Sequence, residues 1–84
     1  MIKEREQFKY RIALKTLESA GVGVDVYISD IYHRMVGAHK RTTPTQMQMY
    51  VGAAISYANR RLVDHVIVPG EKKRTYRIVL KPIA

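Results

Sequence analysis

The stretch from Thr43 to Lys81 constrains the fold of this chain more than any other. Its first residues can start a helix: Thr43 can cap the first turn, Pro44 suits the first helical position, and Gln46 can reach back to the cap amide. The helix is expected to run from Pro44 to about Arg61. Its apolar residues fall on one stripe at helical spacing, formed by Met47, Val51, Ala54, Ile55, Ala58 and Leu62.

Two strands are expected after this helix, over 63–68 and 75–80, and a basic turn over 69–74 joins them. The second strand alternates between two faces, as a half-buried strand does. The residues expected to pack on the helices are Tyr76, Ile78 and Leu80. The residues expected to stay partly wet are Thr75, Arg77 and Val79. The two strands therefore predict an antiparallel hairpin with a basic tip.

The chain before residue 37 is expected to form two helices and a short strand. Apolar residues at helical spacing predict a helix over 4–19, which glycines at 21–23 then end. Branched and aromatic residues over 24–28 predict the strand. Ser29 is expected to cap a second helix of about 30–36.

Composition and charge set the broad class. With 84 residues, 46% of them hydrophobic, the chain can bury one modest core, so 1–84 is expected to be a single domain. Lys and Arg total 15 against 7 acidic residues, which gives a net charge of +8. This balance favours a polyanionic partner, most often nucleic acid, before an acidic protein or an anionic membrane surface. No apolar run is long enough to span a membrane, and cysteine is absent, which fits a cytoplasmic protein.

The side of the 44–61 helix opposite its apolar stripe is uncharged until it ends in arginine. It carries Thr45, Met49, Gly52, Ala53, Ser56 and Arg60, with Gln46 and Gln48 on its flanks. Gly52 costs about 1 kcal/mol relative to alanine in mid-helix, so something should compensate for it. One interpretation is that small residues let the helix approach a DNA groove, where glutamine can contact adenine and methionine a thymine methyl. The other is that they let another helix or a second subunit cross closely.

The hairpin concentrates positive charge. From Arg60 to Lys81 there are seven basic and two acidic residues, net +5 of the chain's +8. The basic residues of the turn and of the second strand are Lys72, Lys73, Arg74 and Arg77. Such a hairpin can lie along phosphates or enter a minor groove, and each phosphate that it neutralises releases counterions. A solvated surface loop is the alternative.

Three further groups of residues have side chains that could form a site. Lys40 and Arg41 precede the 44–61 helix, where they fit either a phosphate clamp or plain loop charge. The three histidines are widely spaced and lack cysteine partners, so neither a metal site nor a cofactor is expected. Of the tyrosines, Tyr10, Tyr27 and Tyr76 occupy core-like positions, and Tyr57 is the one expected to be open to contact.

The order of elements resembles the winged helix-turn-helix superfamily of DNA-binding domains. The resemblance covers nearly the whole chain and is most specific from Arg60-Arg61-Leu62-Val63 through Pro69-Gly70 and Lys72-Lys73-Arg74 to Tyr76. It implies an α+β fold with three helices and a small antiparallel sheet, ordered helix, strand, helix, helix, strand, wing, strand. It also implies a third helix in the major groove of DNA, with the wing on phosphates or the minor groove.

These features predict a binding protein and not an enzyme, since no nucleophile elbow, phosphate-binding glycine loop or metal-ligand helix is present. The first hypothesis is a small transcriptional regulator, of the size of a phage or plasmid regulator, that binds double-stranded DNA on the nucleoid. Dimerisation is expected, because one recognition helix contacts few base pairs, and the first helix is a candidate interface. The alternative is a protein-interaction module of the same fold that docks on a polymerase or a replication factor.

Overall fold

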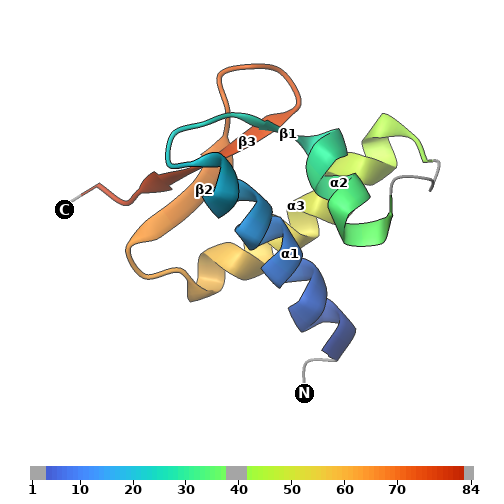
Figure 1. The fold of residues 1–84 in the computed structure, drawn as a ribbon, viewed down its shortest axis with the longest axis horizontal. Coiled ribbons are helices and arrows are strands. Elements are labelled where there is room, and N and C mark those ends of the chain that lie inside the picture. The colour runs from blue at the N-terminus through green and yellow to red at the C-terminus, as the bar shows by residue number, and fades with distance from the viewer. Residues whose placement is uncertain (1–3, 38–41, 83–84) are drawn as a thin grey trace.

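The computed structural model describes residues 4–37 and 42–82, with side chains from Tyr10 onward. Its elements are α1 (Glu4–Ala20), β1 (Val26–Tyr27), α2 (Ile28–Val36), α3 (Pro44–Arg61), β2 (His65–Pro69) and β3 (Thr75–Leu80). The expected α+β class, with three helices and a small antiparallel sheet in this order, is confirmed (Figure 1). Within the described residues, no helix is both long and apolar enough to cross a membrane.

The sheet has the strand order β1-β3-β2, so β3 is its central strand. β2 and β3 form a ribbon in which His65 lies opposite Leu80 at one end and Pro69 lies opposite Tyr76 at the other. β1 pairs only with the first two residues of β3, next to the hairpin turn. The ribbon therefore has two distinct ends, one at the turn and one where β2 begins and β3 finishes.

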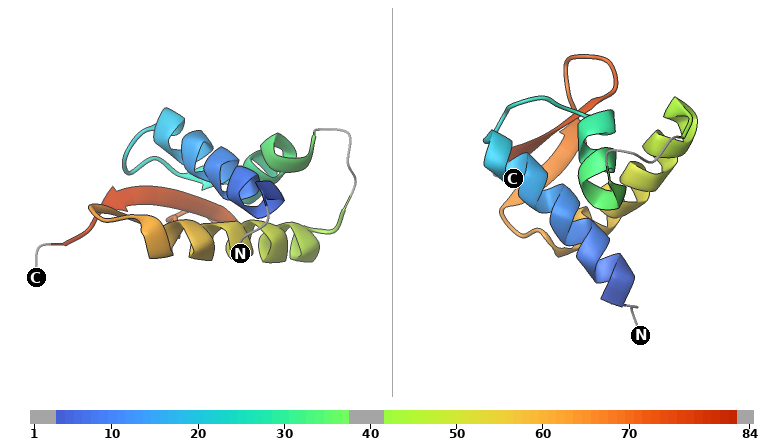
Figure 2. Two further views of the ribbon diagram at one scale, coloured as in Figure 1. Left: turned by 90° about the horizontal axis from the view of Figure 1, so that it is seen from below. Right: turned by 45° about the vertical axis from the view of Figure 1, so that its right-hand side comes forward.

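The three helices pack around one core that also includes the sheet. In Figure 2, left, α1 and α2 lie on one side of the molecule and α3 runs along the other, so one side of α3 is left uncovered by the other elements. The largest fully buried side chains, Leu17, Ile31 and Val51, come one from each helix, while Ile67 and Ile78 close the core from the ribbon. The apolar stripe predicted for α3 is the buried one, with Val51, Ala54, Ile55 and Ala58 inside.

The start of α3 follows its local sequence. The Thr43 hydroxyl oxygen accepts from the Gln46 amide at 3.2 Å, and Pro44 takes the first helical position, as expected. The Gln46 side chain differs from the expectation, because its Oε1 accepts from the Thr42 hydroxyl at 2.5 Å instead of binding the cap amide. The first turn is thus capped by Thr43 alone, while Thr42 binds only the Gln46 side chain, and α3 ends at Arg61, at its predicted end.

The start of α2 differs from the sequence prediction. The helix begins at Ile28, two residues early, and Ser29 lies inside its first turn, so the prediction that Ser29 caps it was wrong. Tyr27 occupies the cap position without a side-chain hydrogen bond. The Ile28 amide donates instead to the Arg74 carbonyl at 2.8 Å, so a residue of the hairpin takes the place of a local cap.

Two positions of β3 also differ from the alternation that the sequence suggests. Thr75, expected on the wet face, is 4% exposed, and its hydroxyl donates to the Lys72 carbonyl at 2.6 Å. Burial is tolerated because this hydroxyl is hydrogen-bonded. Leu80, expected to face the helices, is 62% exposed at the end of the ribbon.

Asn59 fixes the middle of β2 to α3. Its side-chain nitrogen donates to the Ile67 carbonyl at 2.9 Å, and its oxygen accepts from the Ile67 amide at 2.8 Å. One side chain therefore satisfies both backbone groups that Ile67 presents on the outer edge of β2. This contact sets how α3 lies against the ribbon and blocks the edge against another strand.

Candidate nucleic-acid interface

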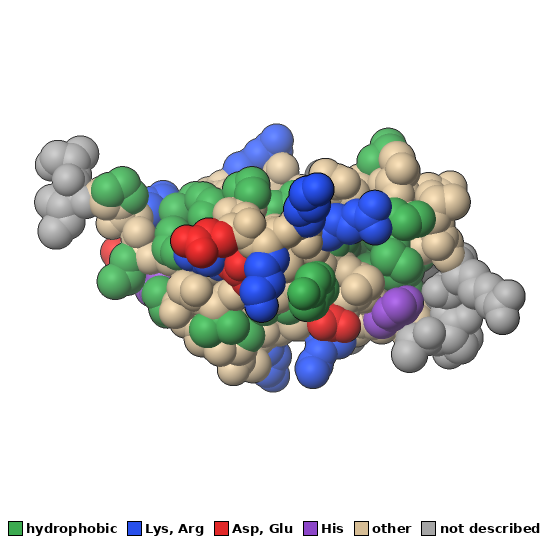
Figure 3. Space-filling model, turned by 90° about the horizontal axis from the view of Figure 1, so that it is seen from above, with side chains coloured by type: hydrophobic (Ala, Val, Ile, Leu, Met, Phe, Trp, Pro, Cys, Tyr) green, Lys and Arg blue, Asp and Glu red, His purple; other side chains and the backbone are tan. Residues whose placement is uncertain are grey.

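A groove of about 350 Å³ lies where the hairpin turn meets the starts of α2 and α3. Its lining comes from these three places and consists of Tyr27, Ile28, Ser29, Pro44, Met47, Gln48, Lys73 and Arg74. All three lie along the upper edge of the molecule in Figure 1. Figure 3 looks onto this edge and shows Lys and Arg side chains beside hydrophobic and uncharged ones, with acidic side chains close by. The groove brings the two predicted contact sets together, because Gln48 comes from α3 and the two cations come from the hairpin.

The predicted contact residues of α3 lie mostly on its uncovered side. Thr45, Gln46, Gln48, Met49, Ser56 and Arg60 are all exposed. Met49 is the most exposed large apolar residue of α3, at 71%. No residue of α3 is acidic, so this side presents amides, hydroxyls, small side chains and a terminal arginine without a negative charge.

Gly52 departs from the outward position expected for it. It is half-buried on the flank of α3 that faces the sheet, and a Cβ at this position would lie 3.8 Å from the Tyr76 hydroxyl. That spacing is ordinary contact, so Tyr76 leaves room for an alanine. Packing inside the monomer therefore does not require glycine at position 52, although the residue lies next to Tyr76 of β3.

The hairpin tip, residues 70–74, is closed by its own hydrogen bonds. The Gly70 amide donates to the Thr75 carbonyl at 2.9 Å. A Cβ on Gly70 would overlap the side chains of Thr75 and Asp25, so glycine is required at this position. Arg74 has a φ of 59°, a left-handed conformation that costs non-glycine residues free energy and often marks a functional site. Lys72, Lys73 and Arg74 are exposed at this tip.

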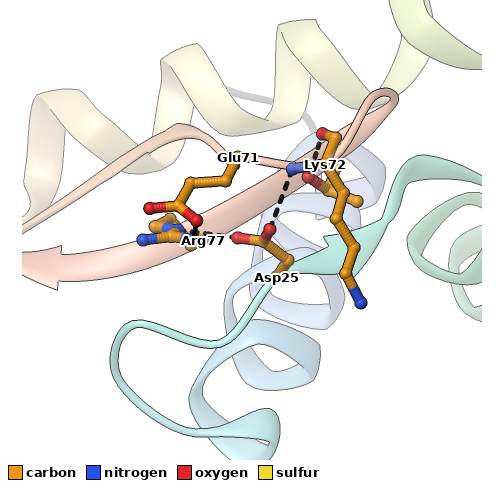
Figure 4. Close-up of polar contacts among 5 residues, drawn as sticks. Asp25, Glu71, Lys72 and Arg77 are labelled. Carbon is orange, nitrogen blue, oxygen red and sulfur yellow. Dashed lines mark hydrogen bonds and ion pairs between the residues drawn. The ribbon is translucent and has the colours of Figure 1, made fainter.

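Arg77 does not share the exposure of the other three hairpin cations. Its Nε donates to Asp25 Oδ1 at 2.6 Å, and its guanidinium lies 4.0 Å from Glu71 (Figure 4). The hydrogen bond to Asp25 raises the pKa of Arg77. The same hydrogen bond, followed by that from the Lys72 amide, lowers the pKa of Asp25. Arg77 is therefore paired within the protein, so that among the described Lys and Arg residues predicted as hairpin contacts only the three tip cations are left exposed.

Other predicted residues fall outside the groove. Lys40 and Arg41 lie outside the described residues. Tyr57, expected to be open to contact, is instead packed, with its ring 4.9 Å from that of Tyr10 and 3.5 Å below the Arg61 guanidinium. Its hydroxyl is buried and has no hydrogen-bond partner among the residues that the structure describes. In the same residues, no three His, Asp or Glu side chains gather as a metal site requires.

The far end of the ribbon carries exposed apolar residues. Val63 is 80% exposed and Leu80 is 62% exposed. Val63 follows Leu62 and Leu80 lies opposite His65. Leu62 and His65 line a hollow of about 160 Å³ together with Glu18, Val22 and Ile78. This surface, Val22, Val63, Leu80 and the hollow, is called the apolar end below. It is separated from the hairpin tip by the length of the ribbon.

The sequence alone did not identify three residues at this edge of the molecule. Tyr27 was expected in the core, but it is 48% exposed and lines the groove with Ser29. Asp25, which the sequence does not single out as a site residue, binds the hairpin. Its partners Lys72 and Arg77 lie 47 and 52 residues away, so no local pattern could have signalled these contacts.

Comparisons with protein-family models, with curated proteins and with solved structures find no match for this chain. What the protein does must therefore be inferred from the groove, the uncovered side of α3 and the hairpin tip.

Proposed function

We propose that this chain is a DNA-binding protein of the winged helix-turn-helix kind, acting as a small transcriptional regulator on the nucleoid in the cytoplasm. In this proposal α3 enters the major groove of double-stranded DNA, and the hairpin tip is the wing. The observation that carries it is the groove in which Gln48 of α3 faces Lys73 and Arg74 of the tip. A helix with uncharged polar side chains beside a cationic loop suits a duplex, whose base edges and phosphates lie side by side.

The two parts would do different work. Phosphate contacts hold a protein on any duplex, while contacts to base edges discriminate among sequences. Lys72, Lys73 and Arg74 supply the first kind, because the phosphates that they neutralise release counterions. Gln48 supplies the second kind, since an amide can pair with the edge of an adenine, and Met49 can touch a thymine methyl. α3 contributes no acidic residue that would repel the phosphates.

Affinity for a random-sequence duplex as a function of salt tests this proposal. Each neutralised phosphate adds about 0.9 to the slope of log affinity against log salt, so several contacts give a steep fall. We expect measurable binding at low salt by fluorescence anisotropy, with a slope of roughly −3 or steeper if the three tip cations each contact a phosphate. Absence of binding at low salt would refute the proposal. Selection of duplexes from a random pool then separates a regulator from an architectural protein, because only the regulator enriches a common sequence.

The exposed Met49 favours one alternative. At 71% exposure on the uncovered side of α3, it would suit a protein partner such as a polymerase or a replication factor. The same salt titration separates the two functions, since a protein-docking surface built on Met49 predicts no duplex binding. The charge of the tip and its place beside Gln48 make DNA the better-supported partner.

We further propose that two copies of the chain pair through the apolar end. Val22, Val63 and Leu80 are exposed around the hollow, so a two-fold axis here would let the apolar residues of each copy cover those of the other. Glu18 lines the hollow, and Asp64 and Lys81 are the sequence neighbours of Val63 and Leu80, so charges of both signs lie at this surface. Such a dimer leaves the hairpin tip and the start of α3 free to contact DNA. In this proposal the apolar end, and not α1, is the interface between the two copies.

A further inference from the structure

We infer that Asp25 is a positioning residue that DNA binding requires: the carboxylate holds the hairpin tip so that Lys73 and Arg74 face the start of α3. This inference rests on the proposed function and adds a role to a residue with the same sign of charge as DNA. Long-range electrostatics alone predicts the opposite, because removing a negative charge from a DNA-binding surface should strengthen binding.

Asp25 uses both of its carboxylate oxygens on the hairpin. Oδ1 accepts from Arg77 Nε at 2.6 Å in β3, and Oδ2 accepts from the Lys72 amide at 3.0 Å in the tip (Figure 4). The Asp25 side chain is 9% exposed and that of Arg77 is 23% exposed, so the ion pair between them is partly shielded from water. Charge-assisted hydrogen bonds of this length are stronger than neutral ones and fix geometry as well. One side chain thus connects the segment before β1 to two separate points of the hairpin.

The residues around Asp25 are arranged for this contact. Gly70 has no Cβ, and a Cβ there would collide with the Asp25 carboxylate. On the far side of the tip, Arg74 adopts its left-handed conformation and its carbonyl accepts from the Ile28 amide at 2.8 Å. The tip is therefore held from two directions, by Asp25 at Lys72 and by the first residue of α2 at Arg74.

These two attachments determine where the tip cations lie. Lys73 and Arg74 follow directly after the residue whose amide Asp25 binds, and both line the groove shared with Gln48. Without the carboxylate, the Lys72 amide loses its acceptor, and Arg77 loses its hydrogen-bonded partner and keeps only the longer contact to Glu71. We expect the tip to leave the groove, so its charges would no longer contact the same duplex as α3.

Two isosteric substitutions test this inference, Asp25→Asn and its control Glu71→Gln. Each removes one negative charge from the same hairpin, but Glu71 is 85% exposed and lies 4.0 Å from Arg77, so it holds nothing in place. We expect Glu71→Gln to bind a duplex as well as the wild type or up to severalfold more tightly. We expect Asp25→Asn to bind about tenfold more weakly at the same salt, the equivalent of about 1.4 kcal/mol. Equal gains for both variants would overturn the positioning role of Asp25.

Arg77→Lys tests the same geometry without changing the net charge. Lysine keeps the positive charge but lacks the planar Nε–H that meets Asp25 Oδ1, so we expect weaker duplex binding than in the wild type. Unchanged affinity would contradict the inference. Hydrogen exchange of the Lys72 amide supplies a readout that needs no DNA, and it should accelerate in Asp25→Asn and in Arg77→Lys. The exchange of the Val51 amide, in the middle of α3, should stay slow and show that the fold is intact.

The outcomes for the wild type separate this inference from the proposed function. If the wild type fails to bind a duplex at low salt, the proposed function fails. If the wild type binds and Asp25→Asn binds as well as Glu71→Gln, only the role of Asp25 fails. If Lys72 exchange is unchanged in Asp25→Asn, the carboxylate does not hold the tip and the inference is likewise refuted.

Discussion

The two ends of the β2–β3 ribbon differ in almost every property. At the hairpin tip the side chains are cationic, the backbone includes a left-handed arginine, and an acid from outside the ribbon holds the loop. At the apolar end the exposed residues are Val63 and Leu80, and the neighbouring charges nearly cancel. In our proposal, one small ribbon serves two partners, a polyanion at its tip and a second copy of the chain at its other end.

The largest effect is expected from removing the charge of the tip. Replacing Lys72, Lys73 and Arg74 together with alanine should weaken binding to every duplex by on the order of 100-fold and flatten the salt slope by about 3. Fluorescence anisotropy over a range of salt measures both quantities. The matched control replaces Arg11, Lys15 and Arg34, which are also exposed but lie on α1 and α2, and leaves the same net charge. Equal losses in the two triple variants would mean that net charge, and not the tip, drives binding.

The contact between the ribbon and α3 should affect stability more than binding. Asn59→Ala removes two hydrogen bonds and leaves the amide and carbonyl of Ile67 unsatisfied on the edge of β2, so we expect a loss of about 2 kcal/mol. Urea unfolding followed by circular dichroism measures it. Thr45→Ala, at an exposed site of the same helix, is the control and should change the free energy of unfolding by less than about 0.5 kcal/mol. A loss no larger than that of the control would show that Asn59 does not hold the ribbon.

Acidic substitutions should separate the two partners. Val63→Asp adds a charge to the apolar end and should weaken self-association about tenfold or more, as measured by analytical ultracentrifugation, without changing the affinity of a single copy for DNA. Ser56→Asp adds the same charge to the uncovered side of α3, so it should weaken DNA binding without changing self-association. A wild-type protein that stays monomeric at high concentration would refute the proposed pairing of two copies through the apolar end.

Gly52→Ala should raise stability while testing how closely DNA approaches α3. The monomer has room for the added Cβ, so the better helix propensity of alanine should stabilise the fold by up to about 1 kcal/mol. If this flank approaches the duplex, binding should weaken severalfold even though the protein is more stable. Unchanged affinity would place Gly52 outside the contact surface, and a loss of stability would show that the flank is packed more tightly than the structure indicates.

The smallest effect is the acid dependence of the attachment at the tip. The pKa of Asp25 is lower in the folded protein than its ordinary value, chiefly because of the hydrogen bond from Arg77. Stability from such a carboxylate is fully present above its unfolded pKa and is lost as the pH falls through its folded pKa. The difference in unfolding free energy between the wild type and Asp25→Asn should therefore be constant near neutral pH and shrink below about pH 4. A difference that does not vary with pH in this range would mean that the carboxylate charge contributes nothing.

Local and distant contacts explain how much of this structure the sequence could predict. The start of α3 and both bounds of β3 were predicted to the residue, and the end of α3 was predicted at about Arg61, where it lies. For α3, the Thr43 cap, Pro44 and the apolar stripe all act within a few residues. The start of α2 was missed because Arg74, far along the chain, satisfies its first amide. Serine at position 29 carried a local capping signal that this tertiary contact overrode.

The candidate site follows the same division. The exposed amides of α3 and the tip cations were predicted from the helix period and from charge. The pairing of Arg77 was not, because its partner Asp25 is 52 residues away and belongs to a segment without a strong pattern. Nor could the helix period alone show that Tyr76 lies beside Gly52, because that contact depends on how β3 packs against α3.

Amide chemical shifts of the isotopically labelled protein, recorded while a duplex is added at low salt, test most directly whether the groove is the DNA-binding surface. The account predicts that the largest changes fall at Thr45–Met49 and Lys72–Arg74, with little change at Val22 and Val63. Changes centred on the apolar end, or their absence from α3 and the hairpin tip, would contradict it.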